Sequence, residues 1–188
     1  MILVCGDSFT AGEESDTAWP DLIPDTYNIA EPGASNDYIL RATADYVAKA
    51  KHKPEYVIVA WTTPDRIEIS GKHLTPTSWA KYGLGIIDAV FADWDSDWAQ
   101  KKFLTQAELL TSFLTMHDVP HFFMSTFGIQ PWATGAAPAP WLGWPDQGLV
   151  EWMGDCDKGP GGHPLELGHQ RIANRIHTEI LKLGWVHE

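Results

Sequence analysis

Three short apolar runs, separated by segments of helical periodicity, constrain the fold of this chain more than any other feature of its sequence. The runs are Ile2–Cys5, Tyr56–Trp61 and His121–Ser125, with a weaker strand signal at residues 27–30. Such runs are typical of parallel strands that are buried on both faces of a sheet. Parallel strands joined by helices need right-handed crossovers, which cover both faces of the sheet. The sequence therefore predicts an α/β protein with three layers.

The segments between and after these runs carry the helical signals. Apolar side chains recur at helical spacing in residues 36–52 and 97–117, and Asn36 stands in the position of an N-cap. A third stripe follows residue 163 and stops before Gly184, a residue type that favours a helix end. We therefore expect a helix in each connection and a closing helix at the end of the chain.

Composition excludes several classes of protein. The 188 residues fit a single domain (1–188), with 44% hydrophobic and 20% charged residues, as in globular proteins. The net charge is −12 and no Lys/Arg cluster interrupts it, which argues against nucleic acid as a partner. No apolar run approaches the ~20 residues of a membrane-spanning helix, and no basic segment precedes the first strand. Two cysteines are too few for a disulfide framework, so we expect a cytoplasmic protein without a membrane span.

Residues 127–162 form a Trp/Gly/Pro-rich segment without sustained periodicity, which predicts a long surface excursion. Trp132, Trp141 and Trp144 lie in it, and Trp61 ends the second apolar run. Aromatic faces near a site suit sugar rings or acyl chains, so these four residues are candidates for substrate binding. The alternative is that the tryptophans of the excursion pack it onto the body of the protein.

Small and polar residues follow the predicted strands at their carboxyl ends, where ligands bind in open α/β sheets. Ser8 lies in a Gly-Asp-Ser loop directly after the first strand, Gly33 follows the second, and Thr62 and Thr63 follow the central one. A serine on such a turn projects its hydroxyl into the crevice, and its N–H helps to bind an oxyanion. Alone, the loop is equally well explained as a helix cap.

Three blocks of the sequence, in order, resemble those of the SGNH (GDSL-like) hydrolases. The first is residues 6–10, Gly-Asp-Ser-Phe-Thr, in which the resemblance makes Ser8 the nucleophile. The second is residues 28–33 with Asn36, in which it makes Gly33 an oxyanion donor beside the Ser8 N–H. The last is His163-Pro164 before a helix, in which it makes His163 the base. The resemblance covers the whole chain and implies a flavodoxin-like parallel sheet of about five strands.

The chain departs from the family pattern in two places. The third block normally reads Gly-x-Asn-Asp, whereas residues 61–65 read Trp-Thr-Thr-Pro-Asp, which leaves the oxyanion role of the asparagine to Thr63, to backbone N–H groups or to nothing. The triad acid normally stands three residues before the histidine, where this chain has Pro160. Asp157, or Asp155, is the candidate replacement, and the alternative is a Ser–His dyad without an acid.

The resemblance implies a metal-independent serine esterase that needs no cofactor and works through an acyl-serine intermediate. Acetyl esters on carbohydrate are the preferred substrate, so the expected partner is a small ester or an acylated glycan. Two alternatives stay open, a catalytically decayed glycan-binding module and a lipid esterase or thioesterase. The compact chain also resembles small SGNH-like proteins of bacteriophages, which would make it a virion component. No histidine or cysteine spacing in the sequence predicts a metal site.

Overall fold

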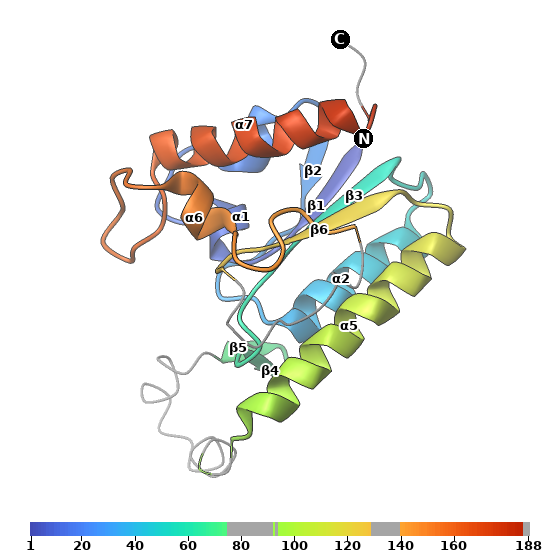
Figure 1. Cartoon of the computed structure of the whole chain (residues 1–188). Coiled ribbons are helices and arrows are strands. Elements are labelled where there is room, and N and C mark those ends of the chain that lie inside the picture. Colours follow the sequence, from blue (N-terminus) through green and yellow to red (C-terminus); the bar gives the residue numbers. More distant parts are fainter. Residues whose placement is uncertain (75–91, 93, 129–139, 186–188) are drawn as a thin grey trace.

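The computed structural model describes residues 1–74, 92, 94–128 and 140–185. At its centre lies a four-stranded parallel sheet with the order β2 (Thr26–Asn28), β1 (Ile2–Cys5), β3 (Tyr56–Trp61) and β6 (His121–Ser125) (Figure 1). Leu3 pairs with Tyr27 on one side and with Val57 on the other, and Val57 pairs with His121. The three main strands occupy the predicted residues, and β2 begins one residue earlier than predicted.

Helices cover both faces of this sheet, which confirms the predicted α/β class with three layers. α2 (Asn36–Lys49) and α5 (Ser96–Met116) lie on one face. α1 (Ser8–Ala11), η1 (Trp19–Leu22), α6 (Leu149–Met153) and α7 (Glu166–Lys182) lie on the other (Figure 1). Alternate residues of β1, β3 and β6 point into two separate cores, as a pleated strand requires. Val4 and Ile58 face α7, whereas Leu3 and Val57 face α2 and α5.

The N-cap of α2 is Ser35, so the prediction of Asn36 was wrong by one residue. The Ser35 hydroxyl accepts the N–H of Tyr38 at 3.3 Å and is fully buried. Serine and asparagine are both good caps, so sequence alone did not separate them. Asn36 instead points its amide toward the loop after β3, which gives it a part in the candidate site.

The described part of residues 127–162 is more than the predicted surface excursion. It contains α6, whose Leu149 and Met153 are buried in the core beside α7. A five-residue helix is too short for a periodic signal, which is why the sequence did not reveal it. Trp141 forms an isolated parallel bridge with Phe123, next to β6, where the expected fifth strand would lie. The two-stranded hairpin of β4 (Ile67–Ile69) and β5 (Lys72–Leu74) was also not predicted.

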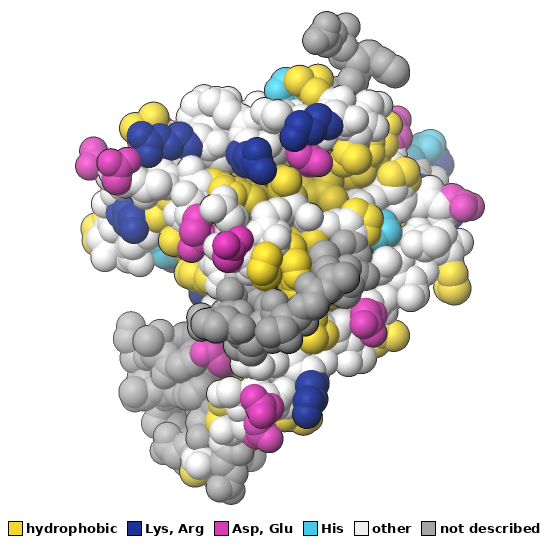
Figure 2. All heavy atoms as spheres, in the orientation of Figure 1, with side chains coloured by type: hydrophobic (Ala, Val, Ile, Leu, Met, Phe, Trp, Pro, Cys, Tyr) yellow, Lys and Arg dark blue, Asp and Glu magenta, His cyan; other side chains and the backbone are white. Residues whose placement is uncertain are grey.

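The surface of the described residues agrees with the acidic composition. Figure 2 shows hydrophobic side chains gathered beneath α7, with both acidic and basic side chains around them. None of the helices built from the described residues is long and apolar enough to cross a bilayer. The carboxyl ends of β1, β3 and β6 meet at one edge of the sheet, so the residues that follow these strands form the candidate site.

Candidate active site

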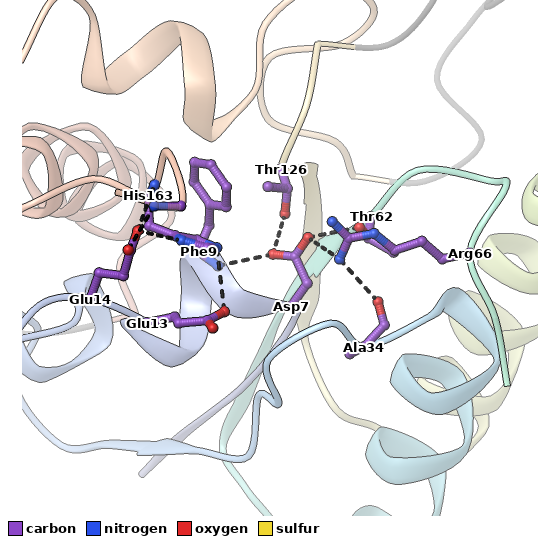
Figure 3. Close-up of polar contacts among 10 residues, drawn as sticks. Asp7, Phe9, Glu13, Glu14, Ala34, Thr62, Arg66, Thr126 and His163 are labelled. Atoms are coloured by element: carbon purple, nitrogen blue, oxygen red, sulfur yellow. Dashed lines mark hydrogen bonds and ion pairs between the residues drawn. The ribbon is translucent and has the colours of Figure 1, made fainter. Parts of the chain in front are cut away.

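The candidate site is built around Asp7, the N-cap of α1, whose carboxylate is fully buried. Its Oδ1 accepts the hydroxyl of Thr126 at 2.9 Å and the N–H of Phe9 at 3.2 Å. Its Oδ2 accepts the hydroxyl of Thr62 at 2.7 Å and lies 3.2 Å from Nη1 of Arg66 (Figure 3). Thr62 follows β3 and Thr126 follows β6. One carboxylate therefore fastens together the ends of three strands.

Ser8 is the first residue of α1, so the buried Asp7 clamp fixes its place directly after β1. The side chain is 4% exposed, and its hydroxyl makes no hydrogen bond to any residue that the structure describes. Its backbone N–H likewise meets no acceptor there, because the first N–H groups of a helix have no partner within it. An N–H of this kind is available to an anion.

Gly33 lies in the connection between β2 and α2 with a φ of +74°, a left-handed conformation that glycine adopts at little cost. Its N–H has no acceptor within the described part of the chain, whereas the next residue, Ala34, donates its N–H to Glu31. Nothing lies closer than 3.9 Å to the position of a Cβ on this glycine, so its backbone is open on that side. The N–H of Gly33, which the resemblance makes an oxyanion donor, therefore has no acceptor among the described residues.

Asn36 braces the loop that follows β3. Its Oδ1 accepts the N–H of Thr62 at 3.0 Å, and its Nδ2 donates to the carbonyls of Thr62 at 3.1 Å and Thr63 at 3.4 Å. An asparagine from α2 thus orders the loop in which the family pattern would have an asparagine of its own. Thr63 is only partly buried and its hydroxyl has no hydrogen bond to a described residue.

His163 precedes α7, and its ring packs against Phe9 with centroids 5.2 Å apart. Nδ1 lies 2.8 Å from Oε2 of Glu14, and Nε2 lies 3.4 Å from Oε2 of Glu13 (Figure 3). Its side chain is 15% exposed. His163 thus packs on the residue that follows Ser8, and no hydrogen bond joins the His163 ring to the Ser8 hydroxyl.

The structure does not bring Asp157 to His163. Asp157 is exposed, and its recorded contact is a carbonyl that accepts the N–H of Leu165 at 3.4 Å. Asp155 is also exposed and pairs with Arg171 at 3.1 Å. The carboxylate that meets Nδ1 of the histidine is Glu14, which the sequence did not single out.

The four candidate tryptophans differ in their surroundings. Trp61 is 0% exposed and packs edge-to-face on Phe103 and Phe123, which is the environment of a core residue. Trp141 packs against the same two rings and is partly buried, and Trp144 stands edge-to-face on Trp141. The fourth, Trp132, lies outside the described residues.

A cavity of about 250 Å³ opens beside Thr63. Its lining mixes an indole ring with polar side chains and consists of Thr63, Pro64, Asp65, Trp94, Ser96, Ala99 and Gln100. Oδ1 of Asp65 is buried without a hydrogen-bond partner among the described residues. Across those residues, no group of three or more His, Cys, Asp or Glu side chains is arranged to hold a metal ion.

No protein-family model matches this sequence, and no curated protein matches it either. Solved structures do match the fold. The psychrotrophic esterase EstA from Pseudoalteromonas sp. is 15% identical, with a TM-score of 0.62 over 97% of this chain and 97% of that one. AlinE4, an SGNH-hydrolase family esterase, is 14% identical, with a TM-score of 0.51 over 97% and 95%. A GDSL-like lipase from Bacteroides thetaiotaomicron is 12% identical, with a TM-score of 0.53 over 97% and 88%.

Identities this low compare folds and not activities, because one fold hosts many chemistries. The structural match nevertheless extends over 97% of this chain, over 97% of EstA and over 95% of AlinE4. This chain therefore has the fold of the SGNH hydrolases.

Proposed function

We propose that this protein is an SGNH-type esterase in which Ser8 is the nucleophile and His163 the base. The observation that carries the proposal is the placement of Ser8 on the first turn of α1, at the ligand edge of the sheet, with His163 packed on the neighbouring Phe9. The N–H groups of Ser8 and Gly33 have no acceptors among the described residues, which supports their role as oxyanion donors.

The proposed reaction follows from these groups. The Ser8 hydroxyl attacks the acyl carbon while His163 takes its proton at Nε2. The N–H groups of Ser8 and Gly33 stabilise the oxyanion of the tetrahedral intermediate, and Thr63 offers a further donor. The intermediate expels the alcohol, which takes the proton from His163 and leaves an acyl-serine. Water then attacks the acyl carbon while His163 takes one of its protons. The second tetrahedral intermediate releases the carboxylic acid as its bond to the Ser8 oxygen breaks, and that oxygen takes the proton back from His163.

The reaction needs a hydrogen bond between Ser8 and Nε2 of His163, and the structure without substrate does not have it. Nε2 instead lies 3.4 Å from Oε2 of Glu13. Catalytic hydrogen bonds are often long in ligand-free sites and tighten when substrate binds. The Glu13 side chain is 44% exposed, so breaking its contact with Nε2 would cost little and would free that nitrogen to accept the Ser8 proton.

Within this function we propose acetyl esters of carbohydrates as substrates. The cavity beside Thr63 supports this choice because it offers an indole, a carboxylate and an amide, from Trp94, Asp65 and Gln100. Carboxylates and amides bind sugar hydroxyls, and an aromatic face suits the apolar side of a sugar ring. A lipid esterase would need a longer apolar tunnel. A glycan-binding module without catalysis is the second candidate, favoured by the missing asparagine of the third block.

The test compares wild type with Ser8→Ala. A serine-directed fluorophosphonate should label wild type only, and Ser8→Ala should lose hydrolysis of nitrophenyl acetate and of acetylated sugars while its circular dichroism spectrum is retained. Acetyl esters should be hydrolysed faster than octanoyl esters. If wild type neither takes the label nor hydrolyses any ester faster than buffer, while it still binds glycans, the binding module is the correct function.

A further inference from the structure

The carboxylate of Glu14 makes several hydrogen bonds to His163 and to the loop that precedes it. One carboxylate oxygen, Oε1, accepts the N–H of Gly161 at 2.7 Å. The other, Oε2, lies 2.8 Å from Nδ1 of His163 and accepts the backbone N–H of His163 at 3.3 Å. Three donors therefore orient one carboxylate, whose side chain is 22% exposed. A carboxylate fixed in this way at Nδ1 sets both the ring orientation and the tautomer of a histidine.

The backbone around Glu14 is shaped for this contact. Glu14 has a φ of +70°, in the left-handed region that residues with a Cβ rarely adopt. Strained backbone of this kind persists where the surrounding structure holds it, often at functional sites. A Cβ on Gly159 would lie 2.7 Å from Cδ of Glu14, and one on Gly161 would lie 2.9 Å from its Oε2. The two glycines thus leave room for the carboxylate.

The surroundings of Glu14 also favour the ionised form of its carboxyl group. The N–H of Gly161 and the ring of His163 hold the pKa of this carboxyl below its ordinary value. Glu14 is therefore ionised at neutral pH, and its charge stabilises the imidazolium that forms when His163 accepts a proton.

We propose that Glu14, from the loop after α1, is the positioning residue that replaces the triad acid at Nδ1 of His163. The inference rests on the proposed function, because it gives His163 the task of a base. Glu14 supplies the carboxylate that is missing at position 160, where the family pattern has an acid and this chain has a proline. The site is then a Ser8–His163–Glu14 triad, in which the acid lies near the nucleophile in sequence and not near the histidine. Asp157 then has no part in the reaction.

The experiment compares Glu14→Gln with two matched variants, Glu13→Gln and Asp157→Asn. Glu14→Gln should lower kcat by about 10²–10⁴-fold with little change in KM, since the tautomer and the stabilising charge are both lost. Glu13→Gln and Asp157→Asn should stay within a few-fold of wild type. Gly159→Ala, which displaces the carboxylate without removing it, should also lower kcat.

A second readout separates this inference from the proposed function. Nitrogen-15 NMR of the His163 ring should show the Nδ1–H of the neutral ring in wild type and a larger share of the other tautomer in Glu14→Gln. An unchanged ring spectrum and an unchanged kcat in Glu14→Gln would overturn the inference, as would a large loss in Asp157→Asn instead. If the wild type has no esterase activity but the ring responds to Glu14→Gln, the pairing stands and the proposed function fails.

Discussion

Asp7 and Glu14 are carboxylates of the same loop region, one on each side of α1, and they differ in what they hold. Asp7 is 0% exposed and its partners come from the ends of β3 and β6. The Glu14 side chain is 22% exposed and its partners come from residues 161–163, just before α7. Burying a charge is costly unless it is paired and fully hydrogen-bonded, which Asp7 is. Asp7 therefore stabilises the framework of the sheet, whereas Glu14 orients the ring of a single histidine.

The largest effect on stability is expected for Asp7→Ala. The change leaves the hydroxyls of Thr62 and Thr126 without their acceptor and leaves Arg66, whose side chain is 13% exposed, without its counter-charge. Removing one partner of a buried pair costs about 3–5 kcal/mol. Urea unfolding should show this loss in the free energy of unfolding. Asp45→Ala is the control, because the Asp45–Lys49 pair is exposed and such pairs contribute about 0–1 kcal/mol.

The next effect is expected for Thr126→Val, which removes one hydroxyl from the Asp7 carboxylate and conserves the shape of the side chain. A hydrogen bond to a charged group contributes about 1.5–3 kcal/mol. The double variant Thr62→Val/Thr126→Val should lose more unfolding free energy than either single variant. Its loss should be smaller than the sum of the two single losses if the remaining contacts of Asp7 strengthen. Equal unfolding free energies for Thr126→Val and wild type would contradict the role of Asp7 as a clamp.

A buried histidine of α7 extends the comparison to pH. His169 is fully buried, its Nδ1 accepts the N–H of Trp19 at 3.1 Å, and burial lowers its pKa. The folded state thus favours the neutral ring, so its contribution to stability is complete above the unfolded pKa of about 6.5 and is lost as the pH falls below it. His169→Asn keeps an acceptor and removes the titration. In urea unfolding at pH 7.5 and pH 5.5, the free energy of unfolding should fall further in wild type than in this variant. The variant should keep a smaller slope from His121, whose pKa burial also lowers.

The elements of this fold were largely readable from sequence because their signals are local. β3 and β6 were predicted at their observed residues, and α7 was predicted within a residue or two, from apolar runs and stripes. The contacts of the site were not readable, because they join residues far apart in the chain. Glu14 and His163 are separated by 149 positions, and the only local trace of their contact is the run of glycines at 159, 161 and 162. The position three residues before His163 holds Pro160, so the sequence pointed to the nearby Asp157 and not to Glu14.

The smallest effect on stability is expected at Glu14, and two substitutions there separate its strain from its contacts. Glu14→Ala and Glu14→Gly both remove the carboxylate, so they lose the same hydrogen bonds to Gly161 and His163. They differ only in the left-handed backbone, which glycine adopts freely and alanine does not. Glu14→Gly should therefore have the higher melting temperature of the two and stay close to wild type, while both lose activity as Glu14→Gln does. A melting temperature that falls as far in Glu14→Gly as in Asp7→Ala would instead place Glu14 in the framework, and the contrast between the two carboxylates would be lost.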